Sequence, residues 1–210
     1  MKTTLLHPMY FGSIAQYVAM VQSNAIVFEN EDNYQKQTYR NRTYIYGANG
    51  KLLLTVPIKH SQKNGRQLYR DIRIENEFTW QQQHWKSLEA AYRTSPFFEY
   101  YEDEFAPLFE KKKEFLLDLN YECMQAITDC LQMDFSYTKT TKFQKEPIDI
   151  IDVRNLINAK KEKTYQLQPY IQVFESKEGF IPNLSILDLL FNEGTNTTSY
   201  LENQLIFQPL

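Results

Sequence analysis

The sequence predicts an α/β fold whose mixed sheet combines an N-terminal βαβ unit and an antiparallel hairpin element with a helical middle third. Two short apolar runs flank a helix-like segment near the N-terminus, strand-like runs flank the turn sequence GANG, and helical apolar spacing begins near residue 80. The chain has 210 residues, 42% of them hydrophobic, and can bury one large core. We therefore expect a single domain over residues 1–210, with a helical subdomain at about 80–133.

The N-terminal unit is predicted from two strands, at 3–6 and 26–28, with a helix between them. Ser13 and Gln16 have the spacing of a capping box at the start of this helix. Apolar residues then follow at helical spacing, at Ile14, Tyr17, Val18 and Val21. A strand–helix–strand unit within one sheet is parallel and right-handed, so the loop after the first strand should open at the carboxyl edge.

The next strands are predicted on either side of the turn at 47–50. Residues 44–46 and 52–58 should form the hairpin, and residues 69–74 a third strand. The helical third then begins with a helix at 80–94.

Proline positions divide the rest of the helical third. Pro96 should occupy the first turn of the second helix, and Pro107 should end that helix because an interior proline loses a hydrogen bond. A further helix is predicted at about 119–131. The tail should contain strands near 148–153 and 170–174 and a helix at 186–193.

Composition limits the classes of function. The net charge is −3 and the isoelectric point about 5.7, so the overall field does not attract nucleic acid and we expect no nucleic-acid partner. No apolar run approaches the roughly 18 residues that span a bilayer. The initial apolar pair is interrupted by His7 and Pro8, so we expect no membrane insertion and a cytoplasmic location. No metal site is predicted, and the sequence identifies no cofactor.

The loop after the first strand is the first candidate site. His7 can transfer a proton there, Tyr10 can donate a hydrogen bond, and Gly12 lets the backbone approach a ligand. The helix beginning after Ser13 would direct its free N–H groups at the same place. The alternative is purely structural: Pro8 makes a rigid turn and Gly12 supplies a positive φ before the cap.

A cationic stretch is the second candidate site. If residues 34–46 are extended, their period of two places Lys36, Arg40 and Arg42 on one face, where they would suit a phosphate or carboxylate. The alternative is an exposed strand whose cations pair with the acidic residues of the ENED segment, 29–32. Because the acidic segment follows the second strand at its carboxyl edge, one of its carboxylates could bind a ribose hydroxyl, or a metal ion through a substrate phosphate. We expect instead that the segment is a solvated loop.

His84 is the third candidate, on the helix at 80–94. It lies near a stripe of Trp85, Leu88 and Tyr92, which favours a half-buried core histidine over a proton-transfer group.

Five segments, in order, resemble the WbqC-like protein family of bacteria: HPMYFGSIAQY, AIVFENEDNYQKQTYRNR, LLLTVPIKH, WQQQHWKSLEAAYRTSPFFEYY and PNLSILDLLFNEG. The matching positions are Pro8, Tyr10, Lys36, Asn41, Arg42, Pro57, His84 and Tyr92. The family often has Gln-Pro where this chain has His7-Pro8, so the resemblance assigns no role to His7. Because the family is named after a gene of O-antigen clusters, the resemblance implies a role in surface-polysaccharide or nucleotide-sugar metabolism.

These observations lead to one main hypothesis and two alternatives. The main hypothesis is a group-transfer enzyme for a phosphorylated or nucleotide-activated small molecule. His7, His84 and Tyr10 would form its catalytic group, and its substrate would be held by Lys36, Arg40, Asn41, Arg42, Gly12, Ser13 and Tyr92. The first alternative is a non-catalytic protein that binds an anionic metabolite or acts as a scaffold. The minor alternative is a nucleotidylyltransferase-like enzyme, although such enzymes use a histidine pair and Tyr10 stands where the second histidine would be.

Overall fold

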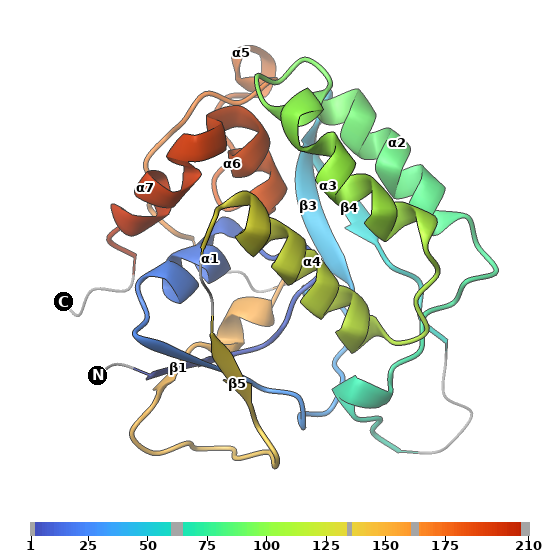
Figure 1. The fold of residues 1–210 in the computed structure, drawn as a ribbon, viewed down its shortest axis with the longest axis vertical. Helices are drawn as coiled ribbons and strands as arrows, with labels where there is room; N and C mark the ends of the chain where they lie inside the picture. Colours follow the sequence, from blue (N-terminus) through green and yellow to red (C-terminus); the bar gives the residue numbers. More distant parts are fainter. Residues whose placement is uncertain (1–2, 60–64, 134–135, 161–163, 207–210) are drawn as a thin grey trace.

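The structure is a computed structural model that describes residues 3–59, 65–133, 136–160 and 164–206. It confirms the α/β class, with a four-stranded parallel sheet, an antiparallel pair of strands and a helical middle third (Figure 1). No helix within these ranges is long and apolar enough to cross a membrane.

The parallel sheet is built around the predicted N-terminal unit. Strand β1 (Thr3–Leu6) leads through helix α1 (Ile14–Val21) to β2 (Ala25–Phe28), which pairs with β1 in parallel. Strand β5 (Tyr137–Lys139) adds to β2, and β6 (Ile151–Asp152) adds to the other side of β1. The sheet order is therefore β5-β2-β1-β6. The sequence prediction placed a strand near β6 but gave none at β5.

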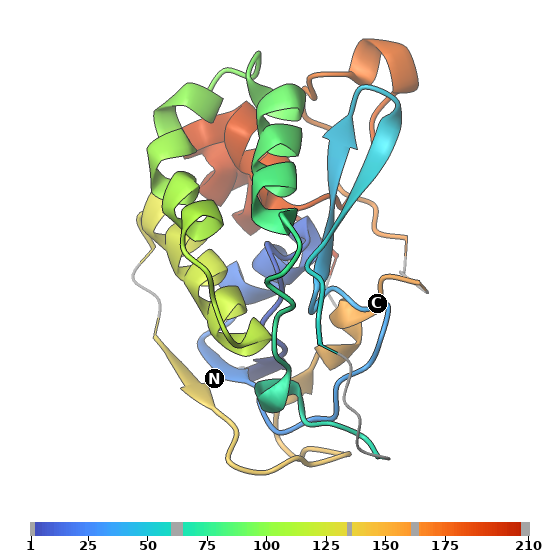
Figure 2. The ribbon, with the colours of Figure 1, turned by 90° about the vertical axis from the view of Figure 1, so that its right-hand side faces the viewer.

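The predicted hairpin forms a separate sheet from β3 (Arg42–Gly47) and β4 (Gly50–Thr55). It lies against helix α2 (Trp80–Tyr92), as Figure 2 shows. The strand predicted at 69–74 is wrong: residues Tyr69–Asp71 form a short 3₁₀ helix. Isolated bridges from residues 73 and 74 replace a regular ladder there.

The helical third continues with α3 (Phe98–Glu110) and α4 (Leu116–Cys130). The first helical residue of α3 is Phe98 rather than Pro96, and α3 continues through Pro107 to Glu110. Pro107 lies on the exposed face of the helix, where water can satisfy the carbonyl that its missing N–H leaves free.

The C-terminal third returns to the N-terminal unit. It contains a 3₁₀ turn (Arg154–Ile157), the short α5 (Glu175–Glu178), α6 (Ile186–Glu193), a second 3₁₀ turn (Gly194–Asn196) and α7 (Thr197–Glu202). No strand forms at 170–174, in contrast to the prediction.

One aromatic cluster joins the layers of the fold. Phe191 of α6 has ring contacts with Tyr92 of α2 and with Phe98 and Phe105 of α3. Phe11, from the loop after β1, contacts Phe105 with a ring-centroid distance of 6.0 Å. Apolar burial of this kind is the main favourable contribution to folding, so it holds the first loop against the helical third.

Candidate functional site

Polar side chains gather where the four parallel strands end. His7 follows β1, Glu29 follows β2, Thr140 follows β5, and Asp152 is the last residue of β6. The strand order runs outward from β1 to β2 and β5, then reverses to β6 on the other side of β1. Open α/β sheets bind ligands outside the carboxyl ends of their strands, where the order reverses.

A pocket of about 380 Å³ lies at this position. Its lining comes from the loops after β1, β2 and β6, and from Phe143 in the loop before β6: His7, Asp32, Gln35, Phe143, Asp152, Arg154, Asn155, Ile157 and Asn158. The pocket therefore lies at the carboxyl edge of the sheet, where we expected a ligand site from the predicted βαβ unit.

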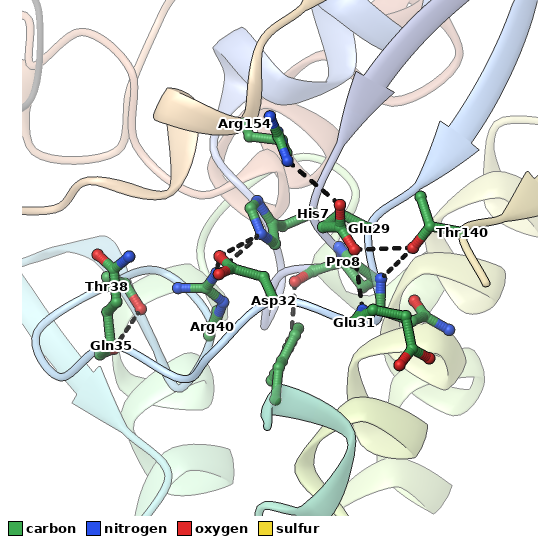
Figure 3. Close-up of polar contacts among 12 residues, drawn as sticks. His7, Pro8, Glu29, Glu31, Asp32, Gln35, Thr38, Arg40, Thr140 and Arg154 are labelled. Carbon is green, nitrogen blue, oxygen red and sulfur yellow. Dashed lines mark hydrogen bonds and ion pairs between the residues drawn. The ribbon is translucent and has the colours of Figure 1, made fainter. Parts of the chain in front are cut away.

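His7, Asp32 and Arg40 form a buried triangle beside the pocket (Figure 3). Arg40 Nη2 lies 2.6 Å from Asp32 Oδ2 and 2.8 Å from His7 Nε2, and the His7 Nε2–Asp32 Oδ2 distance is 3.1 Å. The Arg40 side chain is 0% exposed and stacks over the Tyr69 ring. Such a charge-assisted contact fixes one side of the imidazole ring.

Burial and charge keep His7 neutral near pH 7. Loss of solvation, followed by the positive charge of Arg40, lowers the pKa of His7 to about 4. Burial opposes ionisation of Asp32, but the hydrogen bond with His7 and the charge of Arg40 outweigh it and lower the pKa of this carboxyl. The triangle therefore contains a guanidinium, a carboxylate and a neutral imidazole.

The other ring nitrogen of His7 is buried and has no hydrogen-bond partner among the described residues. Nε2 either accepts from Arg40 or donates to Asp32, and Nδ1 then donates or accepts respectively. In both tautomers Nδ1 is free to bond to a ligand or a water molecule. Buried polar atoms rarely remain unsatisfied, and this one lies on a residue that lines the pocket, which makes it a candidate contact for a ligand.

Arg154 forms a second ionic cluster at the pocket. Nε and Nη2 donate to the Asp152 carboxylate at 2.9 and 2.7 Å, and Nη1 donates to Glu29 at 3.2 Å. The backbone carbonyls of Gln144 and Lys145 accept from the same guanidinium. All five N–H donors of Arg154 thus have partners in the protein.

Glu29 and Asp32 correct the expectation of a solvated acidic loop, because they are 1% and 8% exposed. Glu29 accepts from the Glu31 backbone and the Thr140 hydroxyl in addition to Arg154. These carboxylates anchor the carboxyl edge instead of facing solvent.

Tyr10 and His84 lie together in the core and do not line the pocket. The Tyr10 hydroxyl is 2.8 Å from His84 Nδ1, and Trp80 packs edge-on against both rings. Burial lowers the pKa of His84 to about 4, although a hydrogen bond to the Thr55 backbone raises it. The structure therefore separates His84 and Tyr10 from His7.

Gly12 and Ser13 lie where the start of α1 packs against another part of the protein, and not at an open ligand site. The first backbone amides of α1 already have hydrogen-bond partners: Ile14 N–H donates to the Leu184 carbonyl, and Ala15 N–H donates to Asn183 Oδ1. The predicted capping box is wrong, since Ser13 makes no side-chain cap and Gln16 donates to the His7 carbonyl. Because these amides are satisfied, the start of α1 offers no open anion site.

Gly12 has a role other than the predicted turn. The positive φ of 40° belongs to Phe11. A Cβ on Gly12 would lie 1.8 Å from Gln16 Oε1, so glycine allows the close approach of this side chain, which any larger residue would force to move.

The cationic stretch is not an extended strand. Residues 36–41 form turns, with Gln37 at a φ of 61°, so the shared face predicted for Lys36, Arg40 and Arg42 is wrong. Lys36 is exposed, Arg40 is buried and Arg42 is half-buried. Of these three residues, only Arg40 has a described contact with His7 and Asp32.

Asn41 and Tyr92 have structural partners elsewhere. The Asn41 amide donates to the Val56 carbonyl beside the hairpin. Tyr92 donates to Asp188 Oδ1 and accepts from the Tyr46 backbone. Neither residue lines the pocket.

Sequence reasoning did not find Asp152 and Arg154, and it considered the segment that contains Asp32 as a ligand site but took it to be a solvated loop. The available signal was position: each follows or ends a strand of the parallel sheet, as His7 does. Within the described residues, no three His, Cys, Asp or Glu side chains are placed to hold a metal ion.

Comparison with known proteins agrees with the resemblance in the sequence. The WbqC-like protein family matches over residues 7–166. An uncharacterised protein of Mycobacterium tuberculosis (strain ATCC 25618 / H37Rv), Rv1507c, is 27% identical over 227 residues, which cover 88% of this chain and 96% of that protein. No solved structure matches the chain. More than half of the chain matches the family, and the protein therefore belongs to the WbqC-like protein family.

Proposed function

We propose that the protein is a group-transfer enzyme that acts on a phosphorylated or nucleotide-activated small molecule in the pocket at the carboxyl edge of the sheet. One observation carries the proposal: His7 is buried beside this pocket, neutral, and free at Nδ1. Surface-polysaccharide biosynthesis is the proposed context, because the family is named after a gene of O-antigen clusters.

The environment of His7 suits proton transfer. Asp32 and Arg40 fix the Nε2 side of the ring, so Nδ1 is presented in one direction. A neutral imidazole can take a proton from an attacking group, and Asp32 stabilises the imidazolium that forms. The low pKa means that the proton is then released readily to a leaving group or to water.

Exposed lysines support an anionic substrate. Lys36 follows the lining residue Gln35, Lys142 precedes Phe143, and Lys160 is two residues from Asn158. All three are exposed, and no ion pair involves them among the described residues. These ammonium groups are therefore available to phosphate groups of a substrate bound in the pocket.

One observation favours binding without catalysis as the second candidate. Tyr10 and His84, the other expected proton-transfer groups, bond to each other in the core. Among the residues that the structure describes, a single histidine therefore serves the pocket, and the Tyr10–His84 pairing also argues against the nucleotidylyltransferase-like alternative.

The test combines a thermal-shift screen of nucleotide sugars, sugar phosphates and acyl-CoA with mass spectrometry of reaction mixtures. A stabilising ligand that is turned over should lose about a hundred- to ten-thousand-fold in rate in His7→Gln. His84→Gln is the matched control and should keep the rate. Binding with no turnover in any mixture would favour the second candidate, and turnover unchanged in His7→Gln would refute the assignment of His7.

A further inference from the structure

Among the described residues, the charges of the ion-pair cluster beside the pocket do not balance. Three carboxylates, Glu29, Asp32 and Asp152, face two guanidinium groups, Arg40 and Arg154. Burial keeps His7 uncharged. Glu29 is 1% exposed, Asp32 has 12% of its side chain exposed and Asp152 34%. One negative charge thus remains in a largely buried cluster, where an unbalanced charge is costly.

The charged groups that line the pocket offer acceptors rather than free donors, whereas Gln35, Asn155 and Asn158 line it with neutral amides that can donate or accept. Every donor of Arg154 is bound to protein, and Arg40 does not line the pocket. Asp32 and Asp152 present carboxylate oxygens from its walls. His7 Nδ1 adds a further acceptor when the ring hydrogen is on Nε2. A phosphate placed against these carboxylates would meet like charge.

We propose that the pocket binds its substrate through a primary ammonium group held by Asp32 and Asp152 next to His7 Nδ1. The ammonium group supplies three hydrogen-bond donors and the missing positive charge. Lys36, Lys142 and Lys160, which are exposed and close in sequence to lining residues, would then take the phosphate. The substrate class is an amine that also bears a phosphate. The pocket volume of about 380 Å³ lies within the range of small-molecule sites.

This inference rests on the proposed function for the location of the site, but it is tested by binding alone. Three probes separate the two charged groups: glucosamine 6-phosphate, glucose 6-phosphate and glucosamine. Binding is followed by ring signals of the histidines in NMR spectra, because the chain has three histidines and His7→Gln identifies the signal of His7. The His84 signal is the internal control, since His84 lies in the core away from the pocket.

Glucosamine 6-phosphate should bind at least tenfold more tightly than either other probe and shift the His7 signal. In Asp152→Asn, which keeps the shape of the side chain, the preference over glucose 6-phosphate should disappear. Glu146→Gln removes an exposed carboxylate from the neighbouring loop and should preserve the preference.

Equal or tighter binding of glucose 6-phosphate by the unmodified protein would overturn the ammonium site, as would no binding of any probe. Neither of these results depends on a variant folding. A preference for the amine combined with turnover that survives in His7→Gln would instead leave the ammonium site standing and refute the proposed catalytic role.

Discussion

Replacement of His84 should make the protein less sensitive to acid. Burial lowers the pKa of His84 from 6.5 to about 4, so the unfolded chain binds a proton at this position more readily than the folded chain. The contribution of His84 to stability is complete above pH 6.5 and is lost as the pH falls from 6.5 towards 4. At pH 5 this amounts to about 2 kcal/mol, at 1.36 kcal/mol for each pKa unit.

His84→Gln can preserve both hydrogen bonds of this side chain, although it loses the ring contact with Trp80, and it removes the titration. The glutamine oxygen can accept from Tyr10, and its amide can donate to the Thr55 backbone. The free energy of unfolding, measured by guanidinium denaturation at pH 7 and pH 5, should fall about 2 kcal/mol less in the variant than in the unmodified protein. Lys86→Gln changes an exposed residue of the same helix and is the control. An equal loss in His84→Gln and the unmodified protein would refute the burial argument.

Three further changes test packing and capping by urea denaturation. Gly12→Ala should cost about 1–3 kcal/mol because of the clash with Gln16, and Gln16→Ala in the same chain should recover part of it; no recovery would contradict the clash. Asp188→Ala should cost about 3–5 kcal/mol, since two tyrosine hydroxyls and a glutamine amide lose their acceptor, and a cost under 1 kcal/mol would contradict this. Asn183→Ala should cost about 2 kcal/mol, because the α1 cap is lost and because the left-handed φ of 55° suits asparagine better than alanine, and an unchanged stability would argue against that cap.

Local patterns predicted the parts of the fold that local interactions determine. The apolar runs around α1 gave the βαβ unit, and GANG gave the hairpin, because strand alternation and turn chemistry are properties of neighbouring residues. The segment at 69–74 has a similar pattern, yet it lies against α4 and takes a 3₁₀ turn with isolated bridges. Tertiary contacts decided its conformation, and the sequence does not show those contacts.

The sequence predicted the location of the candidate site better than it predicted which residues form it. The carboxyl-edge rule located His7, but the Arg154–Glu29 ion pair joins residues 125 positions apart, which no local pattern reveals. Lys36 and Arg42 were grouped with Arg40 on the assumption of an extended backbone, but residues 36–41 form turns, with Gln37 in the left-handed region, and have no period of two.

The cap on α1 has a consequence for the order in which the chain folds. Asn183 and Leu184 satisfy amides that lie 168 or more residues earlier, and Ile186 N–H donates back to the Gly12 carbonyl. During synthesis these partners leave the ribosome long after α1 does. We expect nascent or truncated chains that end before Asn183 to keep α1 frayed and open to proteases, so that the earliest helix to be made is among the last to become secure.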